Sequence, residues 1–232
     1  MKDCIKEKLP ATHEEWLKQR NQGIGGSDAG AVLGLNPYKS RLALWAEKTG
    51  KAKHQEQESE AMRIGTDLED YVANRFKELE HKRAKRSGYC YRSKQYPFMR
   101  ANVDRLIIGE NSALECKTAN PLKDSDYSKD IIPPSYYCQC LHYMAVCGFD
   151  RMYLAVLVFQ KGFYTYCIDR SDAGVQADID HLIEEEKAFW ALVESGQEPQ
   201  ADGSEATSDT LKALHHDEGI TLDLCDYDDV FD

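Results

Sequence analysis

The chain has 232 residues, of which 42% are hydrophobic and 30% are charged, so it can form one large domain or a domain with an appendage. No apolar run approaches the roughly 20 residues that a membrane-spanning helix requires, and the N-terminus lacks the apolar stretch of a secretory signal. We therefore expect a soluble, cytoplasmic protein with no membrane association.

The net charge of −11 is unevenly distributed. Residues 198–232 contain eleven acidic residues and one lysine, which leaves a charge of −1 for the rest of the chain. Residues 75–105 contain ten basic and three acidic residues, a local charge of +7. This stretch is typical of a nucleic-acid contact, although a solvated helix end and loop is the alternative. We predict one folded domain at 1–198 and an acidic tail at 199–232 that is loosely packed or contacts a partner.

Eight cysteines are present without a C-x-x-C pair, which argues against an ordinary zinc site. Buried small hydrophobic side chains in a reducing compartment are the expected reading. An iron–sulfur cluster on Cys138, Cys140 and Cys147 is the alternative, but a helix would point Cys138 and Cys140 to different faces.

The N-terminal part is predicted to be helical. A capping box at residues 12–15 predicts a helix that runs through Arg20. In the segment GIGGSDAGAVLG, residues 23–34, Ser27 or Asp28 can cap a short helix whose free N–H groups point toward an anion. The spacing does not fit a dinucleotide fingerprint, because Asp28 occupies the position of the last glycine. A glycine turn between packed helices is the plain alternative.

Two more helices are expected before the first strands. Ser40 caps one that Gly50 terminates, and a longer one spans about 60–80. Glu69 lies along the apolar stripe of the longer helix, where a bare carboxylate would be costly. It must therefore bind a cation or form an ion pair with an arginine. The stripe consists of Ile64, Gly65, Leu68, Val72, Phe76 and Leu79.

The middle of the chain is predicted to form a β-hairpin from strands at 98–108 and 113–118. Because strand side chains alternate, Glu115 and Lys117 share one face. Asp104 can lie across from them on the neighbouring strand. The hairpin therefore brings two carboxylates and a lysine together.

A helix over 135–148 follows, with Gln139 and Tyr143 on a side apart from its apolar stripe. A second hairpin is predicted over 152–168, and Ser171 is expected to cap a long amphipathic helix. The order of helices and hairpins predicts a mixed sheet surrounded by helices.

Asp104, Glu115 and Lys117 form the candidate chemical centre. Two carboxylates about 3 to 5 Å apart repel each other unless a cation lies between them. Magnesium suits this position because it takes oxygen ligands and keeps several waters, and a nearby lysine can position a water or stabilise charge on a phosphate. Surface ion pairs are the alternative, with Asp104 on Arg105 or Arg100 and Glu115 on Lys117.

Five elements in order resemble the PD-(D/E)xK nuclease signature, and specifically the lambda-type phage exonucleases or YqaJ-like viral recombinases. The similarity runs from about residue 20 to 193, with Val103 where the signature has proline and no counterpart for the acidic tail. It implies an α/β (α+β) fold with a PD-(D/E)xK restriction-endonuclease-like core, a central mixed β-sheet flanked by helices. The matching elements are Arg20 before the glycine segment with Ser27, Glu69 in GTDLED, Asp104, the Glu115-Cys116-Lys117 triplet, and Gln139 in a Q-x-x-x-Y/M setting.

The resemblance implies a Mg²⁺-dependent exonuclease, with Mn²⁺ able to substitute, that degrades one strand of linear double-stranded DNA from 5′ to 3′. The 3′ overhangs would serve a single-strand-annealing protein, and the enzyme would form a trimeric ring in the cytoplasm of a bacterium or phage-infected cell. The implied metal ligands are Asp104, Glu115, the Cys116 backbone carbonyl and Glu69; Lys117 would act on the attacking water, Gln139 would orient it, and Arg20 and Ser27 would bind the terminal 5′-phosphate.

Two other functions fit the same residues. One is a PD-(D/E)xK endonuclease of the restriction or junction-cleaving type. The other is a non-catalytic DNA end-binding adaptor, in which the carboxylates form structural ion pairs.

Overall fold

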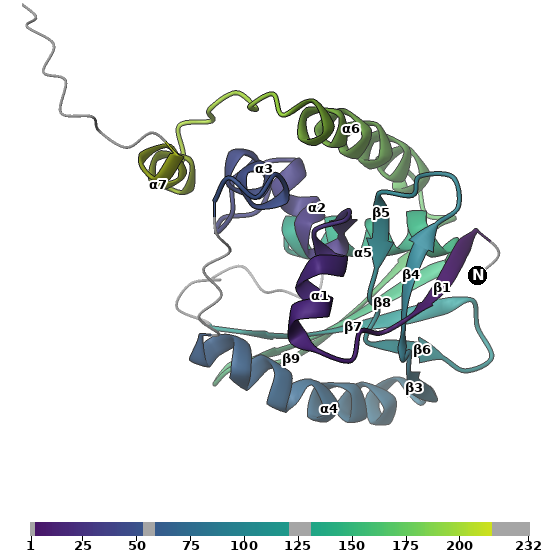
Figure 1. Ribbon diagram of the computed structural model, residues 1–232. Coiled ribbons are helices and arrows are strands. Elements are labelled where there is room, and N and C mark those ends of the chain that lie inside the picture. The colour runs from purple at the N-terminus through teal and green to yellow at the C-terminus, as the bar shows by residue number, and fades with distance from the viewer. Residues whose placement is uncertain (1–2, 53–58, 121–130, 215–232) are drawn as a thin grey trace, which may run out of the picture.

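The structure is a computed structural model that describes residues 3–52, 59–120 and 131–214. Helices and strands alternate along the chain, and Figure 1 shows their arrangement. The elements are β1 (Cys4–Lys8), α1 (His13–Arg20), β2 (Ile24–Gly25), α2 (Gly26–Val32), α3 (Arg41–Lys48), α4 (Glu60–Glu80), β3 (Ala84–Arg86), β4 (Tyr89–Ser93), β5 (Met99–Ala101), β6 (Arg105–Ile107), β7 (Ser112–Ala119), α5 (Pro134–Cys147), β8 (Arg151–Val158), β9 (Gly162–Asp169), α6 (Val175–Ser195) and α7 (Glu205–Leu214).

The described strands form two mixed sheets. The larger has the order β3-β6-β7-β8-β9, in which only β7 and β8 are parallel. The smaller has the order β1-β4-β5-β2, with β2 and β5 parallel. The two sheets and their helices confirm the predicted mixed architecture.

Helices cover both faces of the larger sheet (Figure 1). Along β8, Leu154 and Val156 pack into the core that contains α5, whereas Tyr153 and Ala155 pack against α4, where Phe76 meets the Tyr153 ring. This alternation follows from the two-residue period of a strand. Both faces of β8 are therefore apolar, as expected for a strand with a parallel neighbour and helices on each side.

Helix α5 links the two sheets. It begins after Pro133, because proline fits the first turn of a helix, and it ends at Gly148, whose φ of 63° favours glycine. It packs against β8 of the larger sheet and against β4 and β5 of the smaller one, while α2 and α6 cover it. The predicted helix over 135–148 is confirmed, and its central position explains why nine of its fourteen residues, all from Cys138 onward, are buried.

The predicted strand 98–108 is wrong as one continuous element. It divides into β5, which belongs to the smaller sheet, and β6, which pairs with β7 in the larger sheet. Residues 102–104 cross between the two sheets, and the Asn102 carbonyl accepts a hydrogen bond from the Tyr143 hydroxyl at 3.0 Å. The β6–β7 hairpin itself is confirmed, so Asp104 lies on the link directly before β6.

Three local expectations need correction. Asp28 stabilises the start of α2 from its third position, accepting from the Gly25 N–H at 3.1 Å, because Gly25 holds the cap position. Ser171 does not cap α6, because its N–H and hydroxyl both donate to Asp169 and the helix begins only after Gly174. At the two ends of α4, Ile64 and Leu79 are exposed, since the buried contacts of this helix come from Val72, Ala73 and Phe76.

Helix α7 lies within the predicted acidic tail. Leu211 and Leu214 pack against the cluster that contains Trp45 of α3, and Thr207 is buried. Residues 215–232 lie outside the described residues, so a domain boundary after residue 198 and a partner-binding tail stay predictions. Among the described helices, none combines the length and the apolar character needed to cross a bilayer.

Candidate active site

The two candidate carboxylates meet because the link before β6 lies beside β7. The Asp104 carboxylate accepts a hydrogen bond from the Cys116 backbone N–H at 2.7 Å. Glu115 projects from β7 and is only 4% exposed. Burial, followed by the negative charge of Glu115, raises the pKa of Asp104 well above its usual range. Two acids that raise each other's pKa in this way favour a cation between them.

Glu115 has two differently surrounded oxygens. Its Oε1 accepts from Gln139 Nε2 at 2.6 Å and lies 2.7 Å from Lys117 Nζ. Its Oε2 is buried and has no hydrogen-bond partner in the structure. A buried carboxylate oxygen without a partner costs free energy, so this atom points to a ligand.

Lys117 provides a fixed positive charge. Burial alone would lower the pKa of Lys117, but the charge and hydrogen bond of Glu115 outweigh burial and raise it. The ammonium group also lies 5.5 Å from the centre of the Tyr136 ring, a cation–π contact. In this arrangement Lys117 is protonated, so it can donate a hydrogen bond or stabilise an anion.

These residues fit a divalent cation. Asp104 and the unpartnered Glu115 Oε2 supply hard oxygen ligands, and Mg²⁺ commonly binds through one or two carboxylates and keeps its remaining waters. Within the described ranges, no three His, Cys, Asp or Glu side chains gather as a metal site. The cation would therefore depend on two carboxylates together with non-side-chain ligands such as the Cys116 carbonyl.

Glu69 lies near this centre but is engaged elsewhere. Its Oε1 accepts from Arg105 NH1 at 2.5 Å, and the same guanidinium donates to Asp70 at 2.6 Å and to the Asp104 carbonyl at 2.9 Å. The ion pair expected as the alternative for Glu69 is thus present. A role for Glu69 as a metal ligand stays a prediction and requires a different rotamer.

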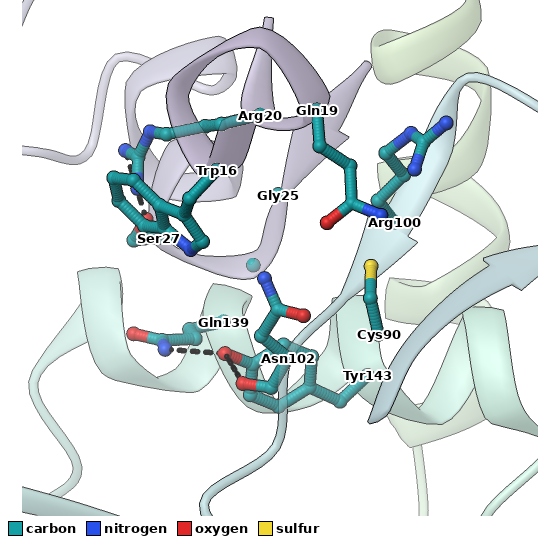
Figure 2. A pocket seen from close by; sticks show the side chains of 11 residues that line it. Trp16, Gln19, Arg20, Gly25, Ser27, Cys90, Arg100, Asn102, Gln139 and Tyr143 are labelled. Carbon is teal, nitrogen blue, oxygen red and sulfur yellow. Dashed lines mark hydrogen bonds between the residues drawn. The ribbon is translucent and has the colours of Figure 1, made fainter. Parts of the chain in front are cut away.

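Arg20 and Ser27 come together at the other end of a pocket. Arg20 NH2 lies 3.3 Å from Ser27 Oγ and 3.1 Å from Asp28 Oδ1, at the junction of α1 and α2. The pocket has a volume of about 190 Å³ and extends from these residues to Gln139 and Tyr143 (Figure 2). Gln139 also donates a hydrogen bond to Glu115, so one residue that lines the pocket contacts the carboxylate centre.

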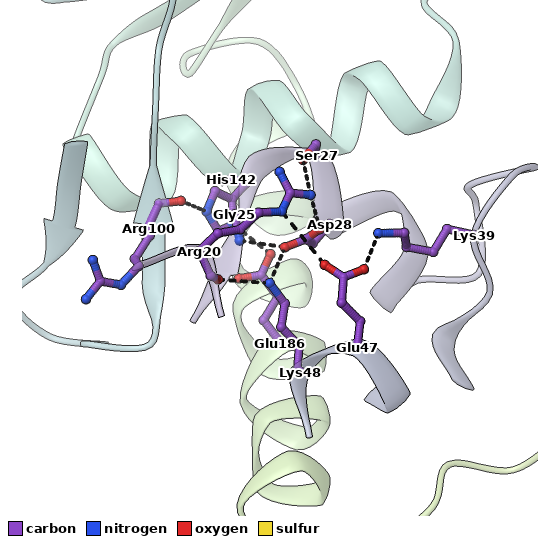
Figure 3. A network of polar contacts seen from close by, with 10 residues as sticks. All are labelled: Arg20, Gly25, Ser27, Asp28, Lys39, Glu47, Lys48, Arg100, His142 and Glu186. Carbon is purple, nitrogen blue, oxygen red and sulfur yellow. Dashed lines mark hydrogen bonds and ion pairs between the residues drawn. The ribbon is translucent and has the colours of Figure 1, made fainter. Parts of the chain in front are cut away.

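A buried ionic network holds Arg20 in place (Figure 3). Lys48 Nζ donates to the Arg20 carbonyl at 3.1 Å and lies 2.8 Å from Asp28 Oδ2. Burial alone would raise the pKa of Asp28, but Lys48 and Arg20 lower it well below its usual range. Glu47 lies 3.8 Å from Arg20 Nε and 2.5 Å from Lys39 Nζ. The Arg20 guanidinium is therefore held by two carboxylates, those of Asp28 and Glu47. Lys48 and Lys39 neutralise part of their charge.

Sequence reasoning missed several residues of this site. Trp16, Arg100 and Asn102 line the pocket, and Arg100 NH1 is paired with Glu7 at 2.8 Å. In Figure 2 the Asn102 side chain lies between the Arg20 end and the Gln139 end. Asn102 precedes Asp104 by two residues, but the sequence gives no sign that the strand breaks there.

The basic stretch 75–105 is less cationic than its composition suggests. At least six of its ten basic residues form ion pairs with carboxylates, several of which come from distant parts of the chain. These pairs are Arg75–Glu78, Lys82–Glu110, Arg86–Asp70, Arg92–Glu7, Arg100–Glu7 and Arg105–Glu69. The excess positive charge available to a nucleic-acid backbone is correspondingly reduced.

The cysteines of α5 are small buried side chains. Cys138, Cys140 and Cys147 all belong to the main core, and each is a free thiol. Burial raises the pKa of Cys140, which disfavours the thiolate that a cluster requires. The burial of these three cysteines agrees with the expectation that they are core side chains.

Solved structures share this fold. A putative exonuclease from Eubacterium rectale covers 97% of this chain and 100% of its own, with a TM-score of 0.63 and 12% identity. The alkaline exonuclease LHK-Exo from Laribacter hongkongensis covers 79% of this chain and 93% of its own, with a TM-score of 0.60 and 20% identity. At these identities the likeness establishes the fold alone, and the predicted fold class is confirmed.

Sequence relatives agree with this likeness. The uncharacterized protein YqaJ of Bacillus subtilis (strain 168) is 40% identical over 204 residues, which is 87% of this chain and 63% of that protein. The chain thus spans a little under two thirds of the length of this relative. The family model described as the YqaJ-like viral recombinase domain matches residues 15–150, which include every candidate site residue. The chain belongs to the YqaJ-like viral recombinase family.

Proposed function

We propose that this protein is a Mg²⁺-dependent exonuclease that degrades one strand of linear double-stranded DNA from its 5′ end and leaves a 3′ single strand. The observation that carries the proposal is the buried pair of Asp104 and Glu115, with an unpartnered oxygen on Glu115 and Lys117 at 2.7 Å. Arg20 and Gln139 line one pocket, and Gln139 donates to Glu115. The likeness in fold to the alkaline exonuclease LHK-Exo and to the putative exonuclease of E. rectale supports the reaction class.

Each side chain has a chemical role in this proposal. Asp104, Glu115 and the Cys116 carbonyl hold the cation, which when bound supplies a water of lowered pKa and polarises a phosphate oxygen. The Lys117 ammonium stabilises the negative charge that develops on the phosphate. Gln139 donates to Glu115 through Nε2, so its side-chain oxygen remains to accept a hydrogen bond from the attacking water.

The Arg20 end of the pocket determines from which end the DNA strand is degraded. Arg20 and Ser27 bind the terminal 5′-phosphate, because a guanidinium and a hydroxyl suit the oxygens of a phosphate. The distance from this anchor to the carboxylates then selects the phosphodiester that is cleaved. Glu69 takes part as a metal or water ligand when Arg105 moves away, and Mn²⁺ substitutes for Mg²⁺ at the same oxygen ligands.

The partners follow from the resemblance in sequence. The substrate is the end of duplex DNA, the 3′ strand passes to a single-strand-annealing protein, and the enzyme acts as a homo-oligomer, a trimeric ring, in the cytoplasm. The structure of one chain bears only on the first of these, through the pocket and its two arginines, Arg20 and Arg100.

One set of substrates tests the proposal. Linear duplex with a 5′-phosphate, the same duplex with a 5′-hydroxyl, and a covalently closed circle are incubated with Mg²⁺ or with EDTA. We expect nucleotide release from linear duplex only when Mg²⁺ is present, and faster release from the 5′-phosphorylated duplex than from the 5′-hydroxyl duplex. Cleavage of the circle would indicate an endonuclease instead, and binding of ends without any release, unaltered in Lys117→Ala, would indicate an adaptor.

A further inference from the structure

Tyr143 lies at the centre of the site without being one of its expected chemical groups. Its hydroxyl accepts a hydrogen bond from Gln139 Nε2 at 2.8 Å and donates one to the Asn102 carbonyl at 3.0 Å. The same Gln139 nitrogen donates to Glu115 at 2.6 Å. Both hydrogens of this amide are thus used, one on Glu115 and one on Tyr143, and the opposite amide orientation would place two acceptor oxygens against each other.

These two bonds join the Tyr143 hydroxyl to a neighbour of each carboxylate. Asn102 lies on the link between the two sheets, two residues before Asp104, and has no strand partner to hold it. Gln139 lies one helical turn before Tyr143 on α5 and holds Glu115. The Tyr143 hydroxyl therefore connects the backbone segment that contains Asp104 to the Gln139 amide, which donates a hydrogen bond to Glu115.

The neighbouring residue on α5 supports the same link. His142 Nε2 donates to the Arg100 carbonyl at 2.8 Å, two residues before the carbonyl that Tyr143 binds. His142 is itself fixed by Glu186 of α6, whose Oε1 lies 2.7 Å from Nδ1. His142 and Tyr143, which are consecutive on α5, thus bind the carbonyls of Arg100 and Asn102 at the end of β5. Of the two, Tyr143 also contacts Gln139 and so is linked to the carboxylate centre.

The ring of Tyr143 is fixed as firmly as its hydroxyl. Tyr143 is 4% exposed, and a Cβ added at Gly26 would lie 2.3 Å from its Cε1. Glycine is therefore required at this point of α2 for the ring to keep its position. Burial, followed by the charge of Glu115, raises the pKa of Tyr143, so the hydroxyl stays protonated and keeps its donor.

We propose that Tyr143 is a positioning residue that sets the separation of Asp104 and Glu115, and thereby the affinity of the site for a divalent cation. Its link to catalysis rests on the proposed function, but its effects on the backbone and on cation binding do not. Without the hydroxyl, residues 102–104 lose their tie to α5 and Gln139 loses one of two partners. The carboxylates then adopt a wider range of separations, and fewer of these accept a cation.

The test compares Tyr143→Phe with Tyr137→Phe. Tyr137 is on the same helix, and its hydroxyl donates a bond of similar length, 2.8 Å, to Asp178, on α6. Each variant thus loses one hydroxyl and one interelement bond, so thermal denaturation separates a general loss of stability from a local effect. Hydrogen exchange of a peptide covering residues 101–106 is measured in EDTA, and Mn²⁺ binding is measured by calorimetry without DNA.

We expect Tyr143→Phe to accelerate exchange in residues 102–104 and to weaken Mn²⁺ binding about five- to tenfold, the effect of roughly one hydrogen bond. With DNA, kcat falls by a similar factor while KM stays within about twofold. Tyr137→Phe leaves the exchange rate, the Mn²⁺ affinity and kcat unchanged. Normal exchange and normal Mn²⁺ affinity in Tyr143→Phe would overturn the proposal, even if wild-type protein proved to cleave no DNA.

If Tyr143→Phe does not fold, Gly26→Ala provides a second route to the same question. The added methyl displaces the ring together with its hydroxyl, while no polar group is removed from the protein. We expect the same faster exchange and weaker Mn²⁺ binding. A Gly26→Ala protein that is folded and has wild-type values for both would also contradict the proposed role.

Discussion

Substitution of Lys48 by methionine should reveal how the pocket arginine is supported. Lys48 has no exposed side-chain surface and lies 2.8 Å from Asp28, which is 1% exposed. Methionine keeps most of the volume and removes the charge, which leaves a buried carboxylate with Arg20 as its remaining close cation. Breaking a buried ion pair from one side typically costs about 3 to 5 kcal/mol. We expect a loss of this size in the free energy of unfolding at pH 7.

The pH dependence gives the direction of the effect. Because the pKa of Asp28 is lowered in the folded protein, its ion pairs contribute stability above the unfolded pKa of about 3.9, and this stability is lost as the pH falls. The difference between wild type and Lys48→Met should therefore be largest at neutral pH and shrink at about pH 3, where Asp28 in the variant is protonated. Urea denaturation at both pH values measures it.

Two controls make the reasoning testable. Lys18→Met removes an exposed lysine that lies 2.7 Å from Glu14, and it should leave the denaturation midpoint unchanged. Lys48→Met combined with Asp28→Asn should regain part of the lost stability, because no buried charge is left without its partner. A Lys48→Met protein that loses under about 1 kcal/mol, or loses equally at both pH values, would refute this account.

Three further substitutions have defined outcomes. Arg20→Gln should raise KM for 5′-phosphorylated duplex about tenfold, because a charged hydrogen bond is lost, and should leave KM for the 5′-hydroxyl duplex unchanged. An equal rise in KM for both duplexes would argue against a phosphate anchor. Lys117→Ala should lower kcat at least about 100-fold while DNA affinity, measured by anisotropy with Ca²⁺, stays within about twofold. Gly26→Ala should destabilise the fold by about 1 to 3 kcal/mol in urea denaturation, whereas Gly65→Ala, whose added Cβ would have its nearest neighbour at 3.4 Å, should not.

Local sequence signals predicted most of the elements. The helix at Glu60–Glu80 and the cap at Ser40 were recoverable, because the apolar period and the capping side chain are properties of neighbouring residues. The alternation that places Glu115 and Lys117 on one face is local as well, and the structure has their charged groups 2.7 Å apart. A feature that depends on residues within one helical turn or one strand could therefore be predicted from the sequence.

The errors concern features set by distant residues. The break at Asn102 arises because the two flanking segments pair with different sheets and α5 takes the carbonyl, which no neighbour of Asn102 signals. The burial of Lys48 depends on Asp28, and in sequence a lysine in the last turn of a helix indicates a solvated charge. The ion pairs of the basic stretch, such as Arg92 with Glu7, likewise join residues far apart in sequence.

The link that carries Asp104 has a consequence for when the protein can act. Its two flanking strands belong to separate sheets, α5 ties it down, and Glu186 of α6 steadies α5 through His142. A chain still emerging from the ribosome, with α6 unfinished, lacks this last support. Because contacts between residues so distant in sequence need both partners to be present, Asp104 and Glu115 should reach their final positions only after α6 has been synthesised.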